Sequence, residues 1–183
     1  MRIKTERLVL RPFRLGDDVD LFDMTHDPMT AYDAGWKPHP DIYTTRNVIL
    51  GYMYSDETLA ITFDNHVIGT ISLYRTNLRK NMNCREMGFC LNKKFRNQGF
   101  ISEAIEAMLH YGFFNQRLDM IMICHHANNE ASKKVISKFP FKFEGILRMY
   151  RKLYNGDIID GVFYSMTKDE YEEWKYERIK TKI

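Results

Sequence analysis

A short basic loop between an expected strand and an expected helix is the segment best suited to bind a ligand. The apolar run Met87–Leu91 predicts the strand, and a helical pattern begins near Ile101. Between them, residues 92–99 read Asn-Lys-Lys-Phe-Arg-Asn-Gln-Gly. A helix N-terminus presents unpaired backbone N–H groups and the positive end of the helix dipole, which together bind phosphate. The loop is therefore either a phosphate site, with Gly99 allowing close approach, or an ordinary turn with solvated lysines.

The sequence lacks the motifs of several common enzyme classes. Its ten glycines include no Gly-x-Gly pair, which excludes the dinucleotide-binding fingerprint. One glycine pair, Gly156 and Gly161, has the spacing of a nucleotide-binding loop, but Val162-Phe163 follows where that loop needs Lys-Ser/Thr. His-Glu-x-x-His and Gly-x-Ser-x-Gly are also absent. These absences disfavour dehydrogenases, nucleotide hydrolases, zinc peptidases and α/β-hydrolases.

The composition indicates one globular domain of ordinary size. The 183 residues are 44% hydrophobic and 28% charged, with a formal net charge of +3. That charge neither requires nor excludes a nucleic-acid partner. The three cysteines, Cys84, Cys90 and Cys124, show no Cys-x-x-Cys spacing, and the sequence has neither a signal peptide nor about 18 consecutive apolar residues. We therefore expect a cytoplasmic protein with no membrane contact, no disulfide and no metal.

The first part of the chain should supply a strand and two helices. Residues 8–13 are suited to a strand, and residues 16–27 to a helix with acidic residues in its first turn. Residues 29–40 are rich in Pro and Gly and are expected to form a loop. Asp41 can cap a second helix that ends near Tyr54.

The rest of the chain alternates between strands and helices. Residues 58–63 and 67–74 should pair through a tight turn at residues 64–66. Residues 120–124 are apolar throughout, as in a central strand that is covered on both faces. The other expected elements are a strand at 84–91, helices from Gly99 to about Gly112 and over 129–138, a hairpin over 142–166 that turns at Asn155-Gly156, and a charged helix over 168–180. This order predicts an α/β (α+β) fold in which helices surround one mixed sheet.

The basic loop also carries a family resemblance. Residues 96–101, Arg-Asn-Gln-Gly-Phe-Ile, resemble the Arg/Gln-x-x-Gly-x-Gly/Ala acetyl-CoA loop of the GNAT superfamily, although Ile101 replaces Gly or Ala. Other segments resemble the branch of ribosomal-protein N-terminal acetyltransferases of the RimJ/RimL type: Thr5–Pro12, Ser102–Ala104, Asn129–Ser132 (Asn-x-Ala-Ser), Phe143–Arg148 (Glu-Gly-x-x-Arg) and Gly156–Asp160 (Gly-x-x-x-Asp). Pro140 departs from the Gly usual at its position. The resemblance covers nearly the whole chain.

This resemblance implies a GNAT-type sheet, mixed and mostly antiparallel, with helices on both faces. It implies a single domain over residues 1–183, with a core over about 5–167 and the charged C-terminal helix over about 168–180. The implied cofactor is acetyl-CoA, with its pyrophosphate on backbone amides of the loop and its pantetheine arm along the strand before it. The implied cofactor-binding residues are Phe89, Cys90, Leu91, Arg96, Asn97, Gln98, Gly99, Ile101, Ser102 and Asn129, the last of which also suits a plain N-cap.

The implied reaction is direct attack of a neutral primary amine on the thioester in a ternary complex, without a metal. Glu86 is the candidate base, directly or through water; the alternative is a surface carboxylate paired with Arg85 or with a neighbouring strand. Ser132 is the candidate hydrogen-bond donor to the leaving thiolate, because Ile136 stands where many members of the family have Tyr. The alternative is a helix serine bonded to its own first turn.

The acceptor pocket should involve the first two helices and the segment between them. Trp36 and Asp33 are the candidate substrate-binding residues, and acids clustered there, including Asp23 and Asp27, would attract a cationic amine. An acidic helix start and a core Trp are the better explanation of the same residues. His125-His126 fits ordinary strand-end histidines better than a metal site.

We therefore expect an acetyl-CoA-dependent N-acetyltransferase whose acceptor is a protein N-terminal α-amine. An α-amine with a pKa near 8 needs only about 1.4 kcal/mol to lose its proton at pH 7, whereas a lysine needs about 4.6 kcal/mol. The alternatives are a small-molecule amine (a polyamine, an amino acid or an antibiotic) and a catalytically silent acyl-CoA-binding module. A homodimer is left open, and no direct nucleic-acid contact is expected, although RNA binding by the basic loop is a weaker alternative.

Overall fold

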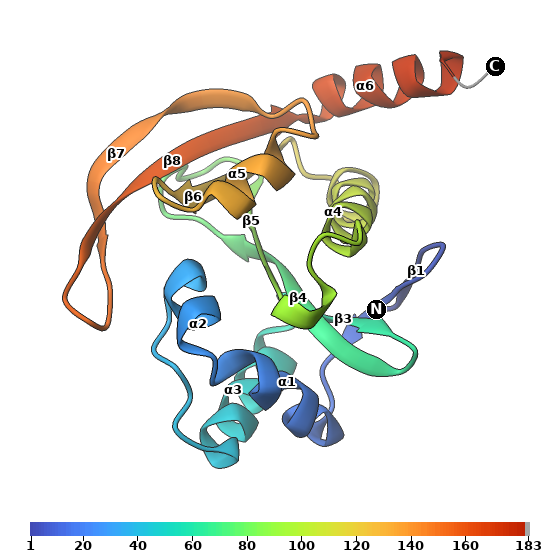
Figure 1. Ribbon diagram of the computed structural model, residues 1–183. Helices are drawn as coiled ribbons and strands as arrows, with labels where there is room; N and C mark the ends of the chain where they lie inside the picture. Colours follow the sequence, from blue (N-terminus) through green and yellow to red (C-terminus); the bar gives the residue numbers. More distant parts are fainter. Residues whose placement is uncertain (182–183) are drawn as a thin grey trace.

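A single twisted sheet organises the chain in the computed structural model, which describes residues 1–181 (Figure 1). Residues 182 and 183, which the expected domain includes, lie outside the described part. The eight strands of this part follow the order β1-β2-β3-β4-β5-β6-β8-β7, and β5 and β6 are the parallel pair. The strands are β1 (Ile3–Lys4), β2 (Val9–Pro12), β3 (Thr58–Phe63), β4 (His66–Arg75), β5 (Cys84–Leu91), β6 (Met120–His126), β7 (Lys142–Lys152) and β8 (Ile158–Thr167). The mixed, mostly antiparallel sheet is thus confirmed.

Helices cover both faces of this sheet, as expected. Along β3, Leu59 and Ile61 belong to the larger core, which includes much of α4, whereas Ala60 belongs to a second core with Leu21 of α1 and Ile49 of α3. This alternation follows from the two-residue period of a strand. The helices are η1 (Leu15–Asp17), α1 (Asp18–Thr25), α2 (Pro28–Ala34), α3 (Ile42–Ser55), η2 (Lys93–Phe95), α4 (Phe100–His110), the π-helical turn η3 (Tyr111–Asn115), α5 (Glu130–Ile136) and α6 (Lys168–Lys180).

The prediction of a loop over residues 29–40 is wrong, because α2 occupies much of this segment. Asp27 caps the helix by accepting a hydrogen bond from the Thr30 amide at 2.9 Å. Pro28 occupies the first turn, where a missing N–H is harmless, and Gly35 ends the helix with a φ of 81°. The Pro and Gly that suggested a loop mark the two ends of a short helix.

Most other elements lie close to their expected positions. Asp41 accepts a hydrogen bond from the Thr44 amide at 2.7 Å and caps α3 as expected. The β3–β4 hairpin turns at Asp64 and Asn65, whose φ values are 47° and 68°. The β7–β8 hairpin and the charged helix α6 are also as expected. Among the described residues, no helix has the length and apolar character needed to cross a bilayer.

Candidate active site

The candidate site opens where the two parallel strands diverge. Pairing between β5 and β6 begins at Cys84 and Met120 and ends at Met87 and Ile123. On its other side, β5 stays paired with β4 as far as Leu91. Residues 88–91 therefore have no strand partner on the β6 side within the described chain. Their backbone can pair with an extended ligand as an added strand would.

A cavity of about 490 Å³ adjoins this divergence, between the end of β5 and the starts of α4 and α5. Nine of the ten residues expected to bind the cofactor line it: Phe89, Cys90, Leu91, Arg96, Asn97, Gly99, Ile101, Ser102 and Asn129. Gln98 is not among the lining residues. Its carbonyl accepts a hydrogen bond from Arg7 Nη1 at 3.0 Å. Ile101 is only 8% exposed within the larger core, and the cavity persists beside its side chain.

The N-terminus of α4 presents free amides at this cavity. The first bond of this helix runs from the Glu103 N–H to the Gly99 carbonyl at 3.1 Å. Among residues 1–181, the N–H groups of Phe100, Ile101 and Ser102 have no hydrogen-bond acceptor. These three amides of one helical turn, together with the positive end of the helix dipole, suit a phosphate group.

Gly99 is required by the backbone more than by a ligand. Its φ is 82°, a left-handed conformation that side chains disfavour. A Cβ at this position would lie 3.3 Å from Arg7 Nη2. Arg7 itself is held by Glu103, with 2.8 Å between its Nε and Oε2, and stacks over the Phe100 ring at 4.5 Å. No spacing pattern predicts this Arg7–Glu103 pair, because the two residues lie 96 positions apart in the chain.

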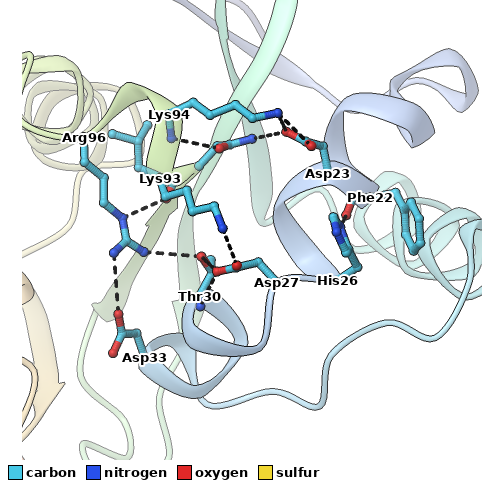
Figure 2. A network of polar contacts seen from close by, with 11 residues as sticks. Phe22, Asp23, His26, Asp27, Thr30, Asp33, Lys93, Lys94 and Arg96 are labelled. Atoms are coloured by element: carbon cyan, nitrogen blue, oxygen red, sulfur yellow. Dashed lines mark hydrogen bonds and ion pairs between the residues drawn. The ribbon is translucent and has the colours of Figure 1, made fainter.

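The cations of the basic loop contact α1 and α2, as Figure 2 shows. The ion pairs are Lys93–Asp27 at 2.7 Å, Lys94–Asp23 at 2.7 Å and Arg96–Asp33 at 3.7 Å. Neither expectation for this loop, a phosphate site or a turn with solvated lysines, included these pairs. These ion pairs therefore connect the loop with α1 and α2.

These contacts perturb the carboxylates. The hydrogen bond from Lys93 holds the pKa of Asp27 well below its usual range, and the hydrogen bond from Lys94 lowers the pKa of Asp23. Burial raises the pKa of Asp33. Asp23 and Asp27 thus stay ionised, and their charges are balanced by the loop lysines rather than available to a cationic amine.

A second cavity, of about 310 Å³, continues from the first. The residues shared by both are Asp33, Ala34, Phe89, Cys90, Asn129 and Ser132. Trp36, the other residue expected to bind the acceptor, lines the second cavity. Its further walls come from the ends of β6 and β7 and from α3, β3, β4 and β5. Because six residues line both cavities, the two adjoin where the strands diverge, and together they are called the cleft below.

Glu86 lies behind the floor of the second cavity. It is 4% exposed, so the surface position of the alternative is wrong, whereas the pairing with a neighbouring strand is confirmed. It accepts hydrogen bonds from Tyr74 Oη at 2.8 Å, on the neighbouring strand, and from Cys124 Sγ at 3.3 Å. Tyr74 and Cys124 line the cavity. Burial, followed by the Glu86 charge, raises the pKa of Cys124 to about 12 and also raises that of Tyr74. Both groups therefore keep their protons at neutral pH.

Asn129 and Ser132 stand where the two cavities meet. Asn129 Oδ1 caps α5 by accepting a hydrogen bond from the Ser132 amide at 2.9 Å, and its Nδ2 donates to the Asp33 carbonyl at 3.2 Å. The N-cap interpretation of Asn129 is thus confirmed, alongside its place in the cavity wall. Within residues 1–181, the Ser132 hydroxyl makes no hydrogen bond, so the alternative of a serine bonded to its own helix turn is wrong.

The two histidines end β6 in the wall of the second cavity. His125 Nδ1 lies 2.8 Å from the His126 carbonyl oxygen. Burial, followed by the nearby Arg151 and His125, lowers the pKa of His126. No group of three or more His, Cys, Asp or Glu side chains in the described part of the chain could hold a metal ion.

Known proteins resemble this chain in sequence and in fold. The acetyltransferase (GNAT) domain model matches residues 7–142. The uncharacterised N-acetyltransferase p20 of Bacillus licheniformis is 31% identical over 177 residues, which cover 91% of this chain and 96% of that protein. The crystal structure of a GNAT-family acetyltransferase from Bacillus anthracis superposes with a TM-score of 0.83 at 25% identity, over 92% of this chain and 99% of that one. The ribosomal L7/L12 α-N-protein acetyltransferase RimL, in complex with coenzyme A, gives a TM-score of 0.78 at 19% identity, over 93% and 99% of the two chains.

Proposed function

The chain belongs to the GNAT acetyltransferase family, and from this premise we propose that it transfers an acetyl group from acetyl-CoA to a primary amine by direct attack in a ternary complex. One observation carries the proposal. Two cavities adjoin at the β5–β6 divergence, with free helix amides beside the first and many polar side chains around the second. Phe89, Cys90, Asn129 and Ser132 line both parts, so a donor and an acceptor bound at the two ends would meet beside these residues.

The residues present fit the donor. The amides of Phe100, Ile101 and Ser102 suit its pyrophosphate. Lys134 of α5 and Lys138, two residues after its end, line the same cavity as further phosphate partners. The unpaired edge of residues 88–91 suits the amide groups of its pantetheine arm. When bound, acetyl-CoA supplies the thioester carbonyl that the amine attacks.

We assign Glu86 an indirect role as base. Because Tyr74 and Cys124 separate it from the cavity, a proton from the amine would reach it through the Tyr74 hydroxyl or a water molecule. Ser132, with a free hydroxyl at the junction, would donate a hydrogen bond to the leaving thiolate. A thiol pKa of about 8.5 makes the thiolate a fair leaving group, so we expect this contribution to be modest.

The acceptor we favour is a protein N-terminal α-amine, in line with the RimJ/RimL-like motifs and with the low energy needed to deprotonate such an amine. A small-molecule amine is the alternative.

We also propose that residues 1–183 form one acetyltransferase domain, because strands from both ends of the chain share the sheet. We propose a cytoplasmic location, because the three cysteines are free thiols. The homodimer stays a prediction.

The test compares acetyl-CoA binding with amine turnover in matched variants. Glu86→Gln should bind acetyl-CoA like the wild type by calorimetry but lose about 10²- to 10⁴-fold in turnover of a peptide amine, measured by thiol release. Tyr74→Phe should lose part of the same activity, while Glu177→Gln, on an exposed face of α6, should lose none. Binding without turnover of any amine in the wild type would identify a silent acyl-CoA-binding module.

A further inference from the structure

Within residues 1–181, one cation in the acceptor part of the cleft has no carboxylate partner. Among the residues that line the second cavity, Arg151 of β7 is the only Lys or Arg. Within residues 1–181 it forms no ion pair, whereas the nearby Arg96 is paired with Asp33. A guanidinium is a planar set of donors that matches a carboxylate through two parallel hydrogen bonds.

The position of Arg151 is defined by its neighbours. Gly35 ends α2 on the opposite side of the cleft, and a Cβ there would lie 2.8 Å from Arg151 Nη1 and 3.2 Å from His126 Cε1. The guanidinium therefore spans from β7 to the end of α2 and packs against backbone that carries no side chain. It also lies 5.3 Å from the centre of the Tyr150 ring, a cation–π contact.

The walls around Arg151 contain further polar atoms without partners. Trp36 Nε1, which can only donate, and His126 Nδ1 are buried and have no hydrogen-bond partner in the described chain. Both residues line the second cavity, and His126 is 9% exposed. Unpaired buried polar atoms are unfavourable, so they are expected where a bound molecule or water completes the site.

Asp33 also lines this cavity but is paired with Arg96 at 3.7 Å, which leaves two opposite charges on different sides of the cavity. Glu86 lies behind the floor, reached through Tyr74 and Cys124, and Arg151 lies on the wall. An acceptor with a cationic amine at the floor and an anionic group at the wall would complement both.

We propose that Arg151 binds a carboxylate of the acceptor, so that the preferred substrates are primary amines with a carboxylate a few bonds from the amine. This inference rests on the proposed function and specifies its acceptor. The carboxylate can be the α-carboxylate of a free amino acid or the acidic side chain of the first residue of a peptide. The experiment uses one pair of compounds for each source.

The amino-acid arm compares phenylalanine with phenylalaninamide, and the peptide arm compares an Asp-initiated peptide with its Asn-initiated counterpart. In at least one arm, the wild type should show a kcat/KM at least tenfold higher for the carboxylate compound, mainly through KM. Arg151→Ala should abolish that preference, and Arg151→Lys should restore part of it. Arg148→Ala, on the same exposed strand but outside the cavity lining, is the control and should keep the preference. The two amines of a pair differ in pKa, and this difference is the same for every variant. It therefore cancels when the ratio of the two kcat/KM values is compared between variants.

Calorimetry in the presence of coenzyme A separates this inference from the proposed reaction. The wild type should bind the preferred carboxylate compound at least tenfold more tightly than its neutral partner, and Arg151→Ala should bind both equally. Equal binding and equal kcat/KM within both pairs for the wild type would overturn the inference, even if amines are acetylated. A carboxylate preference that survives in Arg151→Ala would overturn it as well. Absence of turnover with preferential binding would instead support the inference and contradict the proposed reaction.

Discussion

Replacing Gly99 by Ala tests whether the start of α4 depends on its left-handed backbone. With a φ of 82°, an alanine there carries about 1–2 kcal/mol of conformational strain. Its Cβ would also lie 3.3 Å from Arg7 Nη2, an exposed group that can shift slightly. The reduced entropy of the unfolded chain offsets about 0.4–1 kcal/mol. We therefore expect a net loss of about 1 kcal/mol in the free energy of unfolding, or roughly 2–4 °C in Tm for a chain of this size.

Gly51→Ala provides the matched control, because the same substitution there should raise the free energy of unfolding instead of lowering it. Gly51 lies on the exposed side of α3, and a Cβ would have no heavy atom within 4 Å. Alanine should stabilise this helix by about 0.8–1 kcal/mol. Urea unfolding followed by circular dichroism measures both changes, and calorimetry with acetyl-CoA should show weaker binding for Gly99→Ala only. A Gly99→Ala variant as stable as the wild type, with unchanged acetyl-CoA affinity, would refute this reasoning.

Two further predictions concern the contacts of α2. Because the folded-state pKa of Asp27 lies well below its ordinary value, its ion pair stabilises the protein at pH values above about 4, and that contribution is lost as the pH falls further. Asp27→Asn keeps the cap of α2 but should show a flatter decline of the urea midpoint between pH 5 and pH 2.5; an unchanged decline would contradict the assignment. Asn129→Ala removes the cap of α5 and the bond to the Asp33 carbonyl, and should lower the free energy of unfolding by about 1–2 kcal/mol. Asn129→Ser should recover most of it, and equal losses in the two variants would argue against the capping role.

The features that could be predicted from the sequence are those with a local physical cause. Asp41 as a cap, Asp64-Asn65 as a turn and the apolar run at 120–124 each act through neighbouring residues, and each appears where expected. The residues that line the first cavity were largely predictable as a group, because the strand, loop and helix that carry most of them are consecutive in the chain. By contrast, the segment over residues 29–40 was misread because Pro and Gly occur both in loops and at helix ends.

The residues that could not be predicted are those whose partners lie far away in the sequence. Lys93 and Asp27 are 66 residues apart, and Arg7 and Glu103 are 96 residues apart, so no spacing pattern joins them. The polarity of Glu86 suggested exposure, since buried carboxylates are rare without a partner. Its partners, Tyr74 and Cys124, become visible only when β4, β5 and β6 are placed side by side.

The misread helix α2 is the element that joins the two halves of the cleft. Asp27 at its start binds Lys93 of the loop before α4, and the Asp33 carbonyl accepts a hydrogen bond from Asn129 at the start of α5. Gly35 at its end leaves room for the Arg151 guanidinium. A displacement of this short helix would therefore alter the loop before α4, the cap of α5 and the wall of the second cavity together.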